Sequence, residues 1–404
     1  MAYRFNENDQ FDYEILTALG SAWRHGADVG EVLATAAGVT DASGETWFWT
    51  WAALGRRVRE QGERSAARGR SATARDAFLR AAGYFGLALV GVEACEDPRA
   101  RLREVFGEHR DCFDRFARAW DPPAERVAIP YEGRTLPGYL LSPADRPDPL
   151  ATVIVNNGGH GTISTAWTLL GAPAVARGHR ALLFDGPGQQ SMLFDHGVTF
   201  RPDWEKVVTP IVDHLSARSD VDTGHIALTG VGQAGYWVPR ALAFEHRIAA
   251  AVADPGVVDV SESWWHHLGP ELRALWDSGD RDTFDRVVRE ALGADPALAA
   301  IWRRRARPYG VDSPYDLLAE VARYDVLPVA GQITTPLLIT VPDGEHLWPG
   351  ASRRLYDALP GPRSLVCFTE AEGAHLHCEP LGRALFEQRV FDWLDAHLAP
   401  GPAD

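Results

Sequence analysis

The feature that most restricts the fold of this chain is the run over 226–240, which reads Ile-Ala-Leu-Thr-Gly-Val-Gly-Gln-Ala-Gly-Tyr-Trp-Val-Pro-Arg. Its first residues are apolar and typical of a strand, and Gly230, Gly232 and Gly235 follow closely. A short apolar run that leads into small residues and then into a helical pattern predicts a buried strand, a sharp turn and a helix. The run therefore predicts an α/β fold in which this turn lies at the carboxyl end of a strand.

Three interpretations of this turn are open. It is an ordinary tight turn, or it is a phosphate loop, since Gly230, Gly232 and Gly235 match the Gly-x-Gly-x-x-Gly spacing of dinucleotide-binding folds. The third is a nucleophile elbow, Gly-x-Ser-x-Gly, in which a strained turn presents a serine. Here glycine stands at position 232 where the serine is expected, while Gly230, Ala234 and Gly235 keep the close packing. The elbow is favoured because the residues that should follow an elbow come in the expected order.

The chain of 404 residues is longer than one typical domain. Its first part shows apolar residues three and four positions apart, which predicts four to six helices. The sequence Asp121-Pro122-Pro123-Ala124 then ends the helical pattern, because proline lacks an N–H and disfavours helix in the residue before it. We predict a helical domain over 1–122 and a second domain over 123–404. The expected helical stretches are 12–24, 44–62, 71–94 and 110–119.

In the second domain, short β-rich runs alternate with helical segments, which predicts a mostly parallel sheet with helices on both faces. The helical stretch 257–330 interrupts this alternation, and it contains the adjacent Trp264 and Trp265. An insertion at this place in such a sheet is typical of a lid over the strand ends, where ligands bind. The expected strands are 125–131, 134–142, 151–157, 180–185, 225–231, 248–253, 336–342 and 364–370.

The composition favours a small-molecule partner. The net charge of −15 would repel nucleic acid and anionic lipid, and we expect no basic cluster interleaved with aromatic residues to offset it. The chain has no run of about 18 apolar residues for a membrane span, and its first residues lack a secretory signal pattern. We therefore expect a cytoplasmic protein that binds neither nucleic acid nor membranes.

A metal or disulfide framework is not expected. The four cysteines lack Cys-x-x-Cys spacing and are interpreted as free thiols. His266 and His267 could line a pocket or form half of a metal site, but no further ligand stands at a recognisable spacing. A structural role for this pair is favoured.

An elbow serves a catalytic triad when a carboxylate and then a histidine follow it along the chain. Asp343 and Glu345 come after the apolar run 336–341, and His375 and His377 come after the last expected strand. Glu345 has the better spacing to the proline that follows, whereas Asp343 lies closer to the strand end, so both remain candidates with Glu345 favoured. His377 is favoured over His375 because the preceding Gly-Ala pair provides a turn that brings the later histidine back over the elbow.

An oxyanion hole is also predicted. The backbone N–H of the residue after the elbow position, Gln233, supplies one half of such a hole. The glycine-rich loop 156–162 follows an earlier strand and supplies Gly159 and His160 as candidates for the other half. The loop 185–189, Asp-Gly-Pro-Gly-Gln, is interpreted either as a simple turn or as a loop that faces the substrate.

These motifs give the chain a resemblance to a known family. The sequence over 78–85, Phe-Leu-Arg-Ala-Ala-Gly-Tyr-Phe, together with Ile-Pro-Tyr-Glu-Gly over 129–133, the loop 185–189 and Phe-Arg-Pro-Asp-Trp-Glu over 200–205, resembles α/β-hydrolases that carry an N-terminal helical domain. This group includes 2,6-dihydroxypseudooxynicotine hydrolase and the FrsA-like esterases, and the resemblance extends over nearly the whole chain.

The resemblance implies an active site between the two domains, hydrolysis of a carbon–carbon or ester bond in a small acyl compound, and no cofactor. It assigns the nucleophile to position 232, the acid to 343 or 345, the base to His377 and a substrate contact to Glu205. It also implies a homodimer. The chain departs from the family at Gly232, which cannot form an acyl-enzyme.

Four functions are compatible with this departure. The favoured one is acid–base catalysis by His377 next to a carbonyl, with the enolate held by the oxyanion hole, to form or break a carbon–carbon bond or to cyclise a bulky aromatic or polyketide-like compound in biosynthesis. The second is a serine hydrolase of carbon–carbon or ester bonds in which serine at 232 has been replaced by glycine. The third is direct attack by a water molecule in the space above Gly232, and the fourth is a non-catalytic binding protein.

Overall fold

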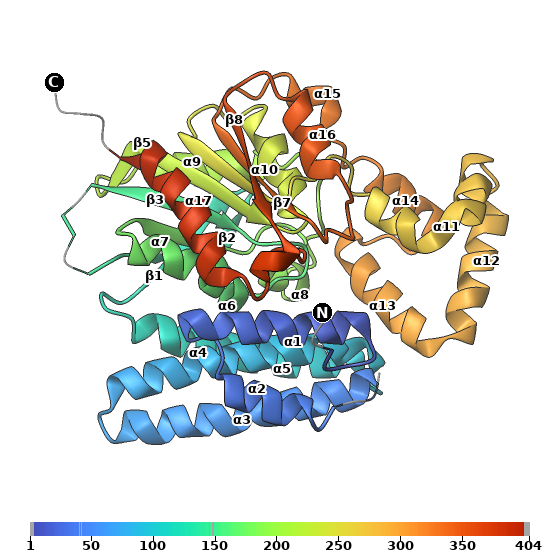
Figure 1. Cartoon of the computed structure of the whole chain (residues 1–404). Coiled ribbons are helices and arrows are strands. Elements are labelled where there is room, and N and C mark those ends of the chain that lie inside the picture. The colour runs from blue at the N-terminus through green and yellow to red at the C-terminus, as the bar shows by residue number, and fades with distance from the viewer. Residues whose placement is uncertain (1–3, 40, 42, 145, 148, 400–404) are drawn as a thin grey trace.

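A single twisted sheet forms the centre of the molecule, with a layer of helices from the N-terminal part of the chain beneath it (Figure 1). The computed structural model describes residues 4–39, 41, 43–144, 146–147 and 149–399. The described residues form an eight-stranded sheet of order β1-β2-β4-β3-β5-β6-β7-β8, in which β2 pairs antiparallel with β1 and β4 and the other neighbours pair parallel. The mostly parallel eight-stranded sheet predicted from the sequence is confirmed. The strands are β1 (Glu125–Tyr131), β2 (Arg134–Leu141), β3 (Leu150–Asn156), β4 (Arg180–Phe184), β5 (Val221–Val231), β6 (Ala250–Asp254), β7 (Leu337–Pro342) and β8 (Arg363–Phe368).

Both faces of the sheet are buried, and each belongs to a different apolar core. Along β3, Val153 and Val155 pack with the N-terminal helices, whereas Ile154 packs into the core on the opposite face. This follows from the two-residue period of a strand, which sends successive side chains to opposite faces. Covering both faces requires near-continuous apolar strands, and this is the pattern that the sequence shows. The helices of this domain outside the insertion are α6 (Ile163–Ala166), α7 (Ala172–Ala176), α8 (Gln190–Phe194), α9 (Glu205–Ser216), α10 (Ala234–Leu242), α16 (Ala351–Ala358) and α17 (Arg383–Leu398), with a π-helical turn η3 (Trp167–Gly171) between α6 and α7.

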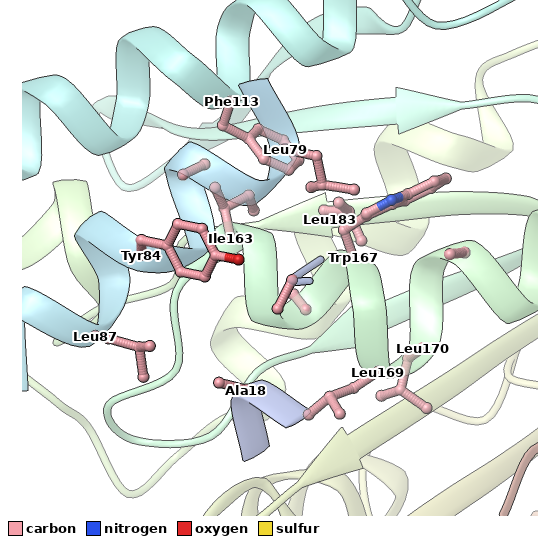
Figure 2. Packing of buried hydrophobic residues seen from close by; sticks show 14 of the residues in the cluster. Ala18, Leu79, Tyr84, Leu87, Phe113, Ile163, Trp167, Leu169, Leu170 and Leu183 are labelled. Carbon is pink, nitrogen blue, oxygen red and sulfur yellow. The ribbon is translucent and has the colours of Figure 1, made fainter. Parts of the chain in front are cut away.

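The N-terminal layer packs against the segment that connects β3 to β4. Figure 2 shows Tyr84 and Phe113 of this layer facing the side where Ile163 and Trp167 lie, and all four side chains are buried in one core. The short helix α2 was not predicted, because it buries only two residues and so gives little periodic signal. The helices of this layer are α1 (Asp9–Ser21), α2 (Val29–Ala36), α3 (Gly44–Ala67), α4 (Ser71–Ala88) and α5 (Pro98–Arg118), with the short helical turns η1 (Ala22–Arg24) and η2 (Leu89–Ala94).

One helical stretch of the N-terminal layer is more apolar than the sequence analysis expected. The helical stretch Ser71–Ala94 is long and apolar enough to cross a membrane by length and composition, although no such run was expected. Within this stretch 78% of the most apolar window is buried inside the protein, which is the behaviour of a helix in the core of a folded domain. The alanines and aromatics that make it apolar are the ones that pack against α3 and α5.

The helical insertion between β6 and β7 extends from the right of the sheet in Figure 1. Its two ends are joined by backbone hydrogen bonds from Val260 N to Tyr324 O (3.1 Å) and from Val326 N to Val258 O (3.0 Å). The insertion therefore begins and ends at one place, and its helices form a separate arm over the edge of the sheet. The helices of this arm are α11 (Glu262–Asp277), α12 (Arg281–Ala294), α13 (Pro296–Ala306) and α14 (Pro314–Val321), with the turn η4 (Arg307–Tyr309) after α13. The short helix α15 (Leu327–Ala330) follows the joined ends and lies beside α16 (Figure 1).

Candidate active site

The turn between β5 and α10 has the geometry of an elbow. Gly232 has a φ of +59°, a left-handed conformation that glycine adopts without steric cost. Its N–H donates to Asp254 O (2.7 Å), and its carbonyl accepts from Gly235 N (2.8 Å). A Cβ at Gly235 would lie 1.8 Å from Pro255 O, so only glycine fits where α10 passes the loop after β6. The small residues around 232 thus serve the close packing that the sequence indicated.

The space above Gly232 opens toward a histidine. A Cβ built at this position would lie 3.6 Å from His377 Nε2 and 3.9 Å from Gly158 Cα, both at ordinary contact distance. A side chain at this position would therefore have room and would point toward the imidazole. Gly232 leaves that space free.

The imidazole of His377 is held from its other nitrogen. His377 Nδ1 lies 2.6 Å from Glu345 Oε2. Glu345 is itself fixed, because its Oε1 accepts from Leu347 N (2.8 Å) and Trp348 N (3.1 Å). The Tyr13 hydroxyl of the N-terminal layer donates to His377 O (3.0 Å). The result is a histidine whose Nε2 faces the turn and whose Nδ1 faces a carboxylate, which is the arrangement of a general base with its orienting group.

The protonation of this pair follows from its surroundings. Burial alone would lower the pKa of His377, but the charge of Glu345 and its hydrogen bond outweigh burial and raise the pKa above the usual value. Burial alone would likewise raise the pKa of Glu345, but the His377 imidazole and two backbone N–H groups hold it below the usual value. Glu345 is therefore ionised at neutral pH and stabilises the imidazolium form of His377.

Two more carboxyl groups lie behind the histidine and were not found from the sequence. Burial raises the pKa of Asp254 and, further, that of Glu379. Thr340 Oγ1 donates to Asp254 Oδ1 (2.7 Å). Glu379 belongs to the loop that carries His377, and Asp254 contacts this loop because its carbonyl oxygen accepts from Cys378 Sγ (3.4 Å). The sequence signal for Asp254 is that it ends an apolar strand.

The predicted oxyanion loop lies against the elbow. Gly158 N donates to Asn157 Oδ1 (3.0 Å), so this N–H already has a partner, and the N–H groups of Gly159 and His160 are the remaining candidates on this loop. Gln189 Nε2 donates to Asn157 O (2.7 Å) and Gly158 O (3.1 Å). Gln189 of the loop 185–189 therefore supports the oxyanion loop, while Gly188 of the same loop lines the cavity next to the elbow, in agreement with the interpretation of a loop that faces the substrate.

These residues border a cavity of about 640 Å³ that all three parts of the chain enclose. His160 lines this cavity, and burial together with the charges of Arg304 and Arg305 holds the pKa of its imidazole well below the usual value. The N-terminal layer contributes Tyr13, Glu14 and Tyr84, the sheet domain contributes Gly159, His160, Gly232, Gln233 and His377, and the insertion contributes Trp264, Arg304, Arg305 and Tyr309.

Three predicted site residues are not brought to this cavity. Glu205 binds Arg240 through two hydrogen bonds of 2.9 Å, so its carboxylate is used within the sheet domain. Trp265 points away from the cavity and packs against Trp276 and Arg273, while its neighbour Trp264 lines the wall. Adjacent helical residues face different sides, so only one of this pair can point inward. Asp343 is exposed to solvent, and the carboxylate that reaches His377 is that of Glu345.

The insertion supplies residues that the sequence reasoning missed. Arg304, Arg305 and Tyr309 line the cavity, and they belong to the run Trp302-Arg-Arg-Arg-Ala-Arg-Pro-Tyr309. This run is a basic cluster beside aromatic residues, contrary to the expectation that the chain has none. The run can be read directly from the sequence, but it was overlooked because the total charge of the chain is strongly negative.

The described residues hold no group of three or more His, Cys, Asp or Glu side chains placed to bind a metal ion. His266 and His267 lie side by side on α11, with ring centroids 5.7 Å apart, and His267 Nδ1 contacts Ser263 O (2.7 Å). His267 also lines the cavity.

The comparisons with known proteins agree with this architecture. No protein-family model matches the chain. Hydrolase LUC6 of a Fusarium species is 30% identical over 403 residues, which cover 95% of this chain and 96% of that protein. Alpha/beta hydrolase pydG of an Acremonium species is 28% identical over 433 residues and covers 98% of each chain.

Among solved structures, 2,6-dihydroxy-pseudo-oxynicotine hydrolase has the same fold, with a TM-score of 0.74 at 22% identity over 94% of this chain and 95% of that one. Its fold likeness covers the helical layer as well as the sheet domain. From the relatives, the eight-stranded sheet and the elbow, we conclude that the chain belongs to the α/β-hydrolase family and is an enzyme of the α/β-hydrolase fold.

Proposed function

We propose that this enzyme uses His377 as a general base on a carbonyl compound and forms or breaks a carbon–carbon bond, or closes a ring, in the biosynthesis of a bulky small molecule. The observation that carries the proposal is the free space above Gly232. A Cβ there would lie 3.6 Å from His377 Nε2, so the base points to the place where a nucleophile would stand, and the chain has no nucleophile there. Loss of the nucleophile of a triad typically costs about a millionfold in rate, so acyl-enzyme chemistry is not supported.

The chemistry that remains needs only a base and an oxyanion hole. His377 Nε2 takes a proton from the carbon next to a carbonyl, and Glu345 stabilises the imidazolium through Nδ1. The carbonyl oxygen becomes an enolate oxygen and accepts hydrogen bonds from the N–H of Gln233 and of Gly159 or His160. To form a bond, the enolate carbon attacks a second carbonyl carbon, whose C=O π bond breaks, and His377 returns the proton to the resulting alkoxide oxygen. Cleavage is the reverse: His377 takes the proton of a β-hydroxyl group, the carbon–carbon bond breaks to give a carbonyl and an enolate, and His377 returns the proton to the enolate carbon.

The walls of the cavity support a bulky substrate. Trp264 and Tyr309 form an edge-to-face aromatic pair with ring centroids 6.1 Å apart, and the Tyr13 ring lies tilted against the His377 ring with centroids 6.1 Å apart. A volume of about 640 Å³ lies in the range of pockets that bury a whole small molecule. Both features favour an aromatic or polyketide-like compound.

Hydrogen–deuterium exchange tests the base. The protein is incubated in D2O with a panel of aryl ketones and 1,3-dicarbonyl compounds, and exchange at the carbon next to the carbonyl is followed by NMR. We expect faster exchange with the protein than in buffer and a loss of about 10²- to 10⁴-fold in His377→Ala. The matched control is His246→Ala, because His246 is exposed on a loop outside the cavity.

The alternative reactions give different results in the same assay. If the protein and His377→Ala bind the compounds equally and neither exchanges, the proposal is wrong and a non-catalytic binding protein is supported. Hydrolysis of p-nitrophenyl esters that disappears in a double variant at Asp343 and Glu345, without exchange, supports direct attack by a water molecule.

A serine hydrolase with glycine in place of serine at 232 is a second candidate, since the site has room for that side chain. The peptide mass of residue 232 in protein from the source organism, or the sequence of the genomic copy, decides between the two. Serine there supports covalent hydrolysis with His377 as base, and glycine supports the acid–base reaction.

We further propose a cytoplasmic homodimer that requires no cofactor. Trp23 is 57% exposed on the N-terminal layer and has Val29 and Leu33 nearby in the chain, both of them exposed. Exposed apolar side chains that form a patch are typical of a contact surface between proteins. Light scattering on a size-exclusion column measures the assembly state.

A further inference from the structure

The four arginines of the basic run 303–307 differ in whether a carboxylate is paired with them. Arg303 and Arg307 both pair with the buried Glu93. Arg304 lies 3.6 Å from Glu14 of α1. These three arginines therefore have carboxylate partners.

Arg305 has no carboxylate partner among the residues that the structure describes. Its Nη2 lies 3.4 Å from Ser263 O and 3.3 Å from Ser263 Oγ, which are long contacts with neutral groups. Its guanidinium stacks over the Trp264 ring at 4.3 Å. A stacked guanidinium without an anion is partly desolvated and uncompensated.

The surroundings of Arg305 make this arrangement costly for the empty protein. Burial and the neighbouring charge of Arg304 lower the pKa of Arg305 to about 10, although Tyr309 opposes this. Burial likewise lowers the pKa of His267 and of His160, so both rings are neutral at pH 7. Buried cations in folded proteins have anionic partners, and a cation without one in a cavity wall points to an anionic ligand.

A continuous wall connects Arg305 to the reacting end of the cavity. Arg305 stacks on Trp264, the Trp264 ring meets Tyr309, and the Tyr309 hydroxyl donates to Gln233 Oε1 at 3.4 Å. Gln233 follows Gly232 directly. One ligand can therefore contact the arginine and the elbow at the same time.

We propose that Arg305, with Arg304 beside it, binds an anionic oxygen group of the substrate, a carboxylate or the ionised enol of a 1,3-dicarbonyl, and holds the reacting carbon at His377. The planar guanidinium suits such a group because it donates two parallel hydrogen bonds to a pair of oxygens. This inference rests on the proposed function, for which it names the substrate class: an acidic compound with an apolar, partly aromatic body.

A pair of probes that differ only in charge tests the inference without turnover. Isothermal titration calorimetry at pH 7 compares 1-naphthylacetate with its neutral isostere 1-naphthylacetamide. We expect the carboxylate to bind at least about tenfold more tightly, which corresponds to about 1.4 kcal/mol. Arg305→Gln should remove this preference while the affinity for the amide stays unchanged, and Arg305→Lys should restore part of it.

The control variant is Arg286→Gln on the outer side of the same insertion, where the side chain is 59% exposed. It removes one positive charge from the same arm, so it should keep the full preference for the carboxylate. Arg304→Gln should reduce the preference less than Arg305→Gln, because Arg304 already has Glu14 as a partner. Unchanged binding of the amide shows that each variant is folded.

Equal affinities for the two probes, a preference that persists in Arg305→Gln, or no binding of either probe up to its solubility limit would each overturn the anion subsite. None of these results concerns proton abstraction. A preference for the carboxylate without hydrogen–deuterium exchange would support the anion subsite and contradict the proposed reaction. Exchange without a preference for the carboxylate would support the reaction and contradict the subsite.

Discussion

The two ends of the cavity, the elbow and the insertion, differ in whether the protein itself supplies a partner for a buried charged group. At the elbow, His377 and Glu345 lie 2.6 Å apart, and each raises the stability of the charged form of the other. At the insertion, Arg305 stacks on an aromatic ring without any carboxylate partner among the described residues. The first end is complete in the empty protein, whereas the second is complete only with an anion bound.

This difference in charge pairing corresponds to two different functions, proton transfer at the elbow and ligand selection at the insertion. A group that transfers protons must be oriented before the substrate arrives, so its partner belongs to the protein. A charged group that selects a ligand contributes most to binding affinity when its ionic partner is part of the ligand. Without the ligand, the unpaired charge lowers the stability of the protein. We expect changes at the elbow to alter rates and changes at the insertion to alter affinity and stability.

We expect the largest effect when a nucleophile is restored at the elbow. Gly232→Ser places a hydroxyl next to His377 Nε2, since the Cβ would lie 3.6 Å from it. The φ of +59° imposes strain of about 1–3 kcal/mol on a serine, which elbows tolerate. We expect hydrolysis of p-nitrophenyl butyrate to rise at least about 10³-fold, as a fraction of what a triad nucleophile contributes.

The double variant Gly232→Ser/His377→Ala is the control for this gain, because the serine then lacks its base. The gain should disappear in it, and a fluorophosphonate probe should label the single variant alone. A folded Gly232→Ser protein with no hydrolysis and no labelling would show that the elbow and His377 do not form a working pair.

The next effect concerns pH. The raised pKa of His377 means that the neutral base accumulates as pH rises through a value above about 6.5, so the exchange rate should fall on the acid side of that value. In Glu345→Gln the carboxylate no longer favours the imidazolium, burial dominates, and the acid limb should move to lower pH. The maximal rate should fall by about 10²- to 10⁴-fold, because the imidazole is no longer oriented or stabilised when charged. An acid limb that stays in place would exclude Glu345 as the partner.

The smallest effects are on stability, and they should have opposite signs at the two ends. Arg305→Gln removes a desolvated cation that has no carboxylate partner among the described residues, and it should raise the free energy of unfolding by about 1 kcal/mol. Glu345→Gln disrupts a buried hydrogen-bonded pair and should lower it by about 1–3 kcal/mol. Urea denaturation at pH 7 in the absence of ligand measures both. A loss of stability in Arg305→Gln would mean that the protein itself compensates this charge.

Sequence patterns located the strands well, because strands buried on both faces are short, apolar and bounded by turns. The run expected over 336–342 is β7, Leu337–Pro342, and the run over 125–131 is β1. The expected start of β5 at 225 was late by four residues, since Val221 already pairs with Leu150 of β3 and an irregularity separates this pair from the apolar run that pairs from Ile226 onward. Helix α2 was missed because it is short and mostly exposed.

At the site, the sequence allowed predictions that depend on the order and spacing of residues along the chain. It did not allow predictions that depend on contacts between distant segments. The order of elbow, acid and histidine singled out Gly232, Glu345 and His377. It could not separate Glu345 from Asp343 physically, because which of two nearby carboxylates turns inward depends on how the loop after β7 folds. Glu205 was assigned to the substrate by likeness alone, and its pairing with Arg240 became visible only in three dimensions.

The α/β architecture and the absence of a hydroxyl at position 232 follow from the order of residues alone, because strand periodicity, turn glycines and residue identity are local properties. Only the tertiary structure shows that Arg304, Arg305 and Arg307 line the cavity and that Arg305 has no carboxylate partner among the described residues. Compensation of a buried charge depends on residues far apart in the chain, here Glu14, Glu93 and Ser263, and no spacing rule connects them. The elbow therefore follows from the order of residues, and the anion subsite follows from how the insertion closes over the helical layer.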